Sequence, residues 1–167
     1  TVPDGFKWWL EKAKDALSRS MVNSQQSVLN SQHSAIMPLL TTKWGQEYPY
    51  NAKVRYLIGD KTYQFMTGCV ATAMAQVMNY WQWPNTVPDG LPDYDYNIQY
   101  NGNDYTWHVG ALPPTWFDWD NMADDYGYYD PEIGKYIRWE TTEAQDKAVA
   151  TLMRYCGQSV EMMYGTA

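Results

Sequence analysis

The sequence predicts an α+β fold, and three local patterns carry that prediction. Apolar side chains keep a helical period without a gap over residues 69–82, and a second helical stripe covers residues 143–156. Between these two stretches, residues 93–109 alternate aromatic and polar side chains about a turn, as β-hairpins do. Two helices and a hairpin in 167 residues indicate one mixed domain, or one and a half.

Composition and charge narrow the class of protein. The formal net charge is −7, which disfavours nucleic acid binding, because that affinity depends on neutralising phosphates. Hydrophobic residues make up 45% of the chain, so it should fold, yet every apolar run is too short to cross a bilayer. No segment typical of a signal peptide opens the sequence, and we expect any such segment to have been removed already. Nine Trp and fifteen Tyr suit either a peptide or glycan cleft or a loop-rich core.

The N-terminal region is expected to be separate from the main domain. Residues 4–18 have the pattern of an amphipathic helix, and residues 23–35 form a polar, nearly uncharged connector. His33 lies in this connector and is interpreted as a solvated linker residue. We therefore predict a boundary near residue 36, with residues 1–36 as one unit and residues 37–167 as the other.

The helix over 69–82 is expected to be central, because it is apolar on several sides. Its predicted buried stripe comprises Val70, Ala73, Met74, Val77, Met78 and Trp81. The hairpin that follows turns at Asn101-Gly102, a strong turn signal. His108 is out of step with the apolar face of its second arm, so it should point to solvent.

The last helix has a clear start. Thr142 and Gln145 have the spacing of a capping box, and Gly157 is expected to end the helix. Cys156 lies on the apolar stripe and is interpreted as a small buried hydrophobe. Residues 160–164 are predicted to begin a strand.

Metal and disulfide chemistry have little support in the sequence. Cys69 and Cys156 could form one disulfide at most, and two histidines are too few for a His-rich metal site. An acidic group invites a calcium hypothesis, but its spacing does not fit an EF-hand and favours a solvated loop. Its members are Asp118, Asp120, Asp124, Asp125 and Asp130. We expect no metal and no cofactor.

Cys69 is the strongest candidate for chemistry. It follows Thr67-Gly68 and begins the central helix, where free N–H groups and the helix dipole favour a thiolate. Gly68 would leave room for a substrate backbone, and Gln46 could join the Cys69 N–H in an oxyanion hole. On position alone, a buried structural cysteine is the more common alternative.

Two segments together resemble the streptopain family of secreted bacterial cysteine peptidases, of the interpain type. The first runs from Pro38 through Trp44-Gly45-Gln46 to Pro49-Tyr50-Asn51, and the second is Thr67-Gly68-Cys69-Val70-Ala71-Thr72-Ala73. Weaker similarity continues through 117–122 and 160–165. Residues 1–20 are similar to the end of the family's propeptide.

The resemblance implies a papain-like fold whose mainly helical half carries Cys69 as nucleophile and Gln46 as oxyanion donor. Gly68, Tyr164 and Gly165 would contact the substrate. The family's catalytic His falls in a later segment, so we expect it beyond residue 167, on an antiparallel sheet missing from this chain. The chain would then be the N-terminal part of a secreted zymogen and virulence factor, inactive alone, with a docked C-terminal fragment as its partner.

Two alternatives remain open. His108 could act as the base, although its place in an aromatic hairpin and the family pattern both disfavour this. The chain could instead be a non-catalytic module that binds peptide or glycan through its aromatic hairpin, with structural cysteines. An inhibitor built like the propeptide is a weaker alternative, because residues 1–36 are a small share of the chain.

Overall fold

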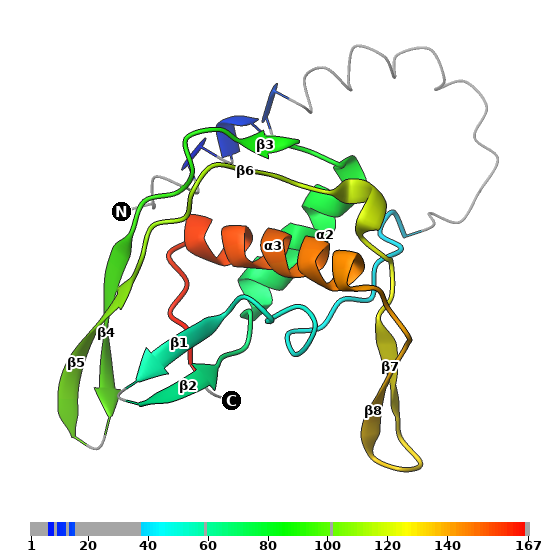
Figure 1. The fold of residues 1–167 in the computed structure, drawn as a ribbon. Coiled ribbons are helices and arrows are strands. Elements are labelled where there is room, and N and C mark those ends of the chain that lie inside the picture. The colour runs from blue at the N-terminus through cyan, green and yellow to red at the C-terminus, as the bar shows by residue number, and fades with distance from the viewer. Residues whose placement is uncertain are drawn as a thin grey trace.

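Two helices that cross at the centre of the molecule organise the fold (Figure 1). They are α2 (Cys69–Trp81) and α3 (Glu143–Ser159), which pack against each other. This computed structural model describes residues 7–8, 10–12, 14–15, 38–58, 60–100 and 102–165. Within those residues the strands pair as small antiparallel sheets around the two helices, so the α+β prediction is confirmed.

Each sheet has two strands, and most are hairpins. The pairs are β1 (Arg55–Ile58) with β2 (Lys61–Gln64), β3 (Thr86–Val87) with β6 (Thr115–Trp116), β4 (Tyr94–Tyr100) with β5 (Asn103–Val109), and β7 (Gly127–Asp130) with β8 (Lys135–Arg138). A short 3-10 helix, η1 (Trp119–Asn121), precedes β7. The β4–β5 pair confirms the predicted hairpin, with Tyr96 opposite Trp107. His108 is exposed as expected, and its Nδ1 lies 2.7 Å from Asp95 Oδ1.

The extent of α2 is confirmed to within one residue, but its predicted buried stripe is largely wrong, because four of its six residues are exposed. The helix ends at Trp81, and Gln82 adopts the left-handed conformation that often closes a helix. The buried side chains are Ala71, Thr72, Met74, Ala75 and Met78. Val70 and Trp81 are instead 52% and 47% exposed. Because α2 is apolar on both sides, the periodicity could not tell which side faces α3.

The start of α3 is confirmed by its capping box. The Gln145 N–H donates to Thr142 Oγ1 at 3.2 Å, and the Thr142 N–H donates to Gln145 Oε1 at 2.9 Å. The predicted end is wrong, because α3 passes through Gly157 to Ser159. A Cβ at position 157 would lie 2.2 Å from Tyr164 Oη, so this glycine makes room for an aromatic ring rather than ending a helix.

The strand predicted at 160–164 is absent, and these residues form a turn followed by extended coil. Tyrosine hydroxyls of β4 hold this segment in place of a neighbouring strand. The Tyr94 hydroxyl donates to the Met162 carbonyl at 2.6 Å, and the Tyr96 hydroxyl donates to the Tyr164 carbonyl at 3.0 Å. The backbone acceptors that a strand partner would use are thus taken by side chains.

Two apolar cores hold these elements together. The larger core lies between α2 and α3 and includes Trp44, Tyr50 and Cys156. The smaller core joins the β1–β2 and β4–β5 hairpins through Phe65, Tyr96 and Tyr164, among others. Aromatic contacts reinforce it: the rings of Tyr56 and Trp107 meet edge to face at 5.6 Å.

The N-terminal predictions fall largely outside the described residues. Residues 7–8, 10–12 and 14–15 are helical, which agrees with the central part of the predicted 4–18 helix. The connector 23–35, His33 and the boundary near residue 36 lie outside the described residues, so the division into two units stays a prediction. In the part of the chain that is described, no helix is long and apolar enough to span a membrane.

Candidate active site

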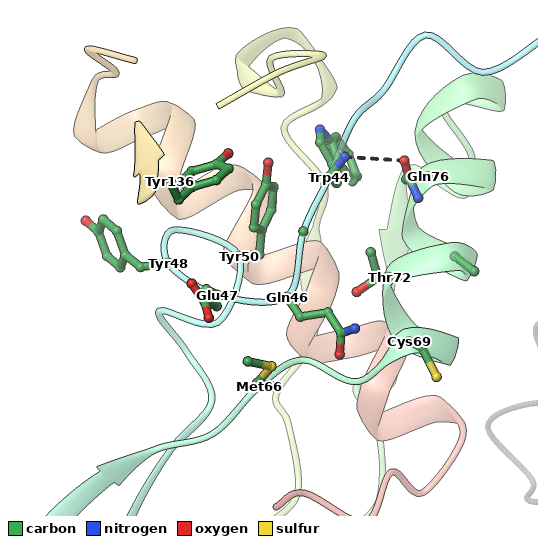
Figure 2. A pocket seen from close by; sticks show the side chains of 12 residues that line it. Trp44, Gln46, Glu47, Tyr48, Tyr50, Met66, Cys69, Thr72, Gln76 and Tyr136 are labelled. Carbon is green, nitrogen blue, oxygen red and sulfur yellow. Dashed lines mark hydrogen bonds between the residues drawn. The ribbon is translucent and has the colours of Figure 1, made fainter. Parts of the chain in front are cut away.

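Cys69 is an exposed thiol at the first residue of α2, where it lines a cavity of about 450 Å³ together with Gln46. The Gln46 side chain extends towards the N-terminal end of α2 (Figure 2). The two residues predicted from sequence as nucleophile and oxyanion donor therefore share one cavity. Its other lining residues are Trp44, Gly45, Glu47, Tyr48, Tyr50, Met66, Thr72, Ala73, Gln76 and Tyr136.

The backbone at Cys69 is fixed by threonine hydroxyls on either side of it. Thr67 Oγ1 and Thr72 Oγ1 are hydrogen-bonded at 2.9 Å across the helix start. The Thr72 N–H and hydroxyl both donate to the Gly68 carbonyl, each at 3.0 Å. Gly68 itself has φ 87°, a conformation that L side chains rarely adopt. These bonds fix the backbone at the start of α2, where the first N–H groups of a helix have no partner within the helix.

The loop that carries Gln46 is tied to α2 and to the segment between β2 and α2. The Gln46 carbonyl accepts from the Thr67 N–H at 3.2 Å. Gln76 Oε1, two turns along α2, accepts from Thr42 Oγ1 at 3.0 Å and from the Trp44 N–H at 3.4 Å, the bond drawn in Figure 2. The candidate nucleophile and the candidate oxyanion donor therefore belong to one connected frame.

The wall farthest from Cys69 is aromatic. Tyr50 is buried against Tyr126, their rings meeting edge to face at 5.4 Å, and burial raises the pKa of the Tyr50 hydroxyl. Tyr48 and Tyr136 complete this wall, the latter from β8. Sequence reasoning missed Tyr136, although a glycine turn at Gly134, between Tyr128-Tyr129 and Tyr136, was a signal for the β7–β8 hairpin.

Cys156 has the opposite environment. It is 1% exposed in α3, its Sγ lies 3.5 Å from Met78 Sδ, and burial raises its pKa. Both cysteines are free, so they are not joined to each other. The interpretation of Cys156 as a buried hydrophobe is confirmed.

The three residues expected to contact the substrate lie in different settings. The side that a Gly68 Cβ would occupy is filled by the Met162 thioether, at 2.7 Å. Tyr164 is 4% exposed, and its hydroxyl accepts from Arg154 Nη1 at 3.3 Å, so only its backbone could reach a ligand. Gly165 is exposed with open space beside it. Substrate contact by these residues stays a prediction.

His108 does not line the cavity that holds Cys69. Its imidazole is instead bonded to Asp95 on the same hairpin and lies 3.9 Å from Asp93. Among the described residues, no group of three or more His, Cys, Asp or Glu is arranged to hold a metal ion. The acidic residues near η1 have local roles, such as Asp125 accepting from the Gly127 N–H at 3.0 Å.

Comparison with known proteins gives a consistent result. A model of the Peptidase C10 family matches residues 44–167. The chain is 30% identical to the thiol protease/hemagglutinin PrtT of Porphyromonas gingivalis over 147 residues, 88% of this chain and 14% of that protein. It is 35% identical to streptopain of Streptococcus pyogenes over 103 residues, 59% of this chain and 22% of that protein.

A solved structure is similar as well. The wild-type interpain A cysteine protease of Prevotella intermedia superposes with a TM-score of 0.52 and 37% identity, covering 77% of this chain and 45% of that one. The papain-like assignment of the fold is therefore confirmed. The chain spans less than half the length of each of these relatives.

Proposed function

The chain belongs to the Peptidase C10 family, and from this premise we propose that it supplies the nucleophile of a cysteine peptidase that cleaves protein substrates. The observation that carries the proposal is the exposed Cys69 thiol at the start of α2, in one cavity with Gln46. A helix start places free backbone N–H donors beside the sulfur, as an oxyanion hole requires.

The proposed reaction has two halves. The Cys69 sulfur attacks the carbonyl carbon of the scissile peptide, and the carbonyl oxygen becomes an oxyanion held by the Cys69 N–H and the Gln46 amide. The C–N bond then breaks, the leaving amine takes a proton from a histidine, and a thioester remains on Cys69. Water hydrolyses that thioester, releases the acid product and restores the thiol.

The histidine is proposed to come from the rest of the protein, docked on α2. The relatives are more than twice as long as the matched region, which leaves room for such a part. The exposed side of α2 carries apolar side chains that suit it, at Val70, Val77, Tyr80 and Trp81. Replacing Val77 with Asp should therefore weaken association with the remaining part and lower activity. Thr106→Asp, at an exposed position on the β4–β5 hairpin, is the control and should do neither.

Residues 1–36 are proposed to be a propeptide that maturation removes, with a cut within about five residues of Ala35, where a small polar connector gives proteases access. The family match begins only at residue 44, which supports this boundary. N-terminal sequencing of the processed protein tests it. A fully active protein that keeps Thr1 as its first residue would contradict it.

Export from a bacterial cell is also proposed. The relatives named above come from bacteria, and the motifs around Gln46 and Cys69 resemble those of a family of secreted bacterial peptidases. Fractionation of the producing organism, with antibody detection in medium, envelope and cytoplasm, tests this. Protein confined to the cytoplasm would overturn it.

The central experiment uses the complete protein. Incubation with an epoxide inhibitor of cysteine peptidases, followed by peptide mapping, should place one adduct on Cys69 and stop hydrolysis of a denatured protein substrate. A complete, folded protein that binds peptide or glycan but shows neither hydrolysis nor an adduct would support a binding module instead.

A further inference from the structure

A second cavity lies on the other side of α2 from Cys69. It shares no lining residue with the first cavity, although both draw on α2. We call its walls the indole socket: Met74 and Met78 from α2, Val87 from β3, Leu91, Phe117, and Tyr155, Cys156 and Ser159 from α3. The ring of Trp8, from the helical residues near the N-terminus, forms the remaining wall.

Trp8 nearly fills the inner end of this socket. It is partly buried and packs against the core between α2 and α3. The space left beside it at the inner end is about 10 Å³, while a shallower hollow of about 190 Å³ remains between Trp8 and residues 87–92. The inner space could hold about one water molecule, so little room remains there while the indole is present.

The chemistry of the walls selects an apolar aromatic ring. Two thioethers, Met74 and Met78, offer polarisable sulfur to a ring, and Phe117 and Tyr155 already meet edge to face at 5.9 Å. The polar atoms of the walls are occupied, since the Tyr155 hydroxyl donates to the Pro113 carbonyl at 2.5 Å. The Ser159 hydroxyl likewise donates to the Cys156 carbonyl at 2.8 Å. A ligand with several polar groups would find little to bond there, whereas an indole carries only its one N–H.

We propose that the indole socket is a binding site for one flat apolar aromatic ring, that Trp8 is its built-in occupant, and that this ring both anchors the N-terminal segment and shields Cys156. When the ring is absent, an indole-sized molecule takes the same place. This inference does not depend on the proposed peptidase activity, because it concerns contacts that Cys69 and Gln46 do not make.

Cys156 supplies a direct reporter. Cys156 lines the socket, its sulfur lies 3.5 Å from Met78 Sδ, and the residue is 1% exposed with Trp8 in place. Removing the indole opens a path from the surface to this sulfur, so its rate of alkylation should follow occupancy of the socket.

The test uses the 167-residue chain with Cys69→Ser, which leaves Cys156 as the one thiol. Trp8→Ala should speed alkylation of Cys156 by about tenfold, because shielding controls thiol reactivity here. Millimolar indole should slow alkylation again and raise the melting temperature of this variant. Trp116→Ala is the matched control: its indole is 64% exposed on β6, so neither quantity should respond to indole.

Trp8→Phe guards against a variant that does not fold. Its smaller ring keeps most of the apolar contact, so alkylation of Cys156 should lie between wild type and Trp8→Ala, and indole should slow it less. If Trp8→Ala fails to fold, the Trp8→Phe result decides. Unchanged Cys156 alkylation in the folded variants, or a melting temperature of Trp8→Ala that indole does not move, would overturn the proposal.

Discussion

The two cysteines occupy opposite environments within one small domain. Cys69 is exposed at the first residue of α2, beside a cavity and the free N–H groups of a helix start. Cys156 lies inside α3 against Met78, where burial raises its pKa. The same side chain is therefore set up for attack in one place and for packing in the other.

This contrast teaches that lying on a helix with an apolar face does not by itself determine the role of a cysteine. Both residues lie on such helices, and both were plausible core residues by composition. What separates them is which part of the helix each occupies and whether the helix has a partner on that side. The difference between the two cysteines can therefore be tested by substituting the cysteines themselves or the residues that surround them.

The largest expected effect is loss of chemistry at Cys69. In the complete protein, Cys69→Ala should abolish hydrolysis of a denatured protein substrate without unfolding the domain, because the sulfur that forms the thioester is gone. Cys156→Ala should keep turnover, since that thiol does not line the cavity. Retained hydrolysis in purified Cys69→Ala protein would remove Cys69 from its proposed role.

Alkylation should sharpen the same contrast without any substrate. Iodoacetamide at neutral pH should modify Cys69 about a hundredfold faster than Cys156, because exposure and thiolate character set the rate. Peptide mapping by mass spectrometry measures both rates in one sample. In urea the two rates should converge, and equal rates in the native protein would contradict the assigned environments.

A smaller effect is expected at Gln46. Gln46→Ala should lower kcat by about a hundredfold and leave KM nearly unchanged, as removal of one oxyanion donor does. Alkylation of Cys69 should stay normal, because the thiolate does not depend on this amide. Gln99→Ala, on the exposed face of β4, serves as the control. A change confined to KM would make Gln46 a binding residue instead.

The smallest effect concerns packing around Cys156. Gly157→Ala should lower the free energy of unfolding by about 1–3 kcal/mol, because the new methyl would overlap the Tyr164 ring. Urea unfolding measures this. Gly110→Ala is the matched control, since a Cβ there would meet nothing within 4 Å. Similar losses in both variants would show that the close approach of Tyr164 has no special cost.

Features with a local chemical signal could be predicted from the sequence. The capping box of α3 depends on two residues three apart, and the β4–β5 hairpin on an Asn-Gly turn, so both were found. Cys69 and Gln46 came from a helix start and from family resemblance, and the structure places them beside one cavity.

Features that depend on tertiary contacts could not be found this way. Tyr136 reaches the Cys69 cavity from a hairpin far along the chain, and nothing local to either segment announces that contact. The predicted end of α3 at Gly157 is wrong because this glycine makes room for the Tyr164 ring. That contact joins residues more than one helix turn apart, so no local pattern reveals it. The exposed side of α2 was predicted wrongly because apolar residues lie on both sides of this helix. The sequence pattern is the same for the side that faces α3 and for the side that does not.

The bonds from Gln76 to the Gln46 loop affect how the two candidate site residues move relative to each other. Gln76 lies two turns along α2 from Cys69 and holds the backbone of Trp44 and the hydroxyl of Thr42. When thermal motion tilts α2, the helix therefore carries the Gln46 loop with it. The displacements of Cys69 and Gln46 are then correlated rather than independent. The separation of the two groups then varies less than the position of either one. Gln76 bonds to neither residue, yet together with the Thr67–Gln46 bond it holds their spacing.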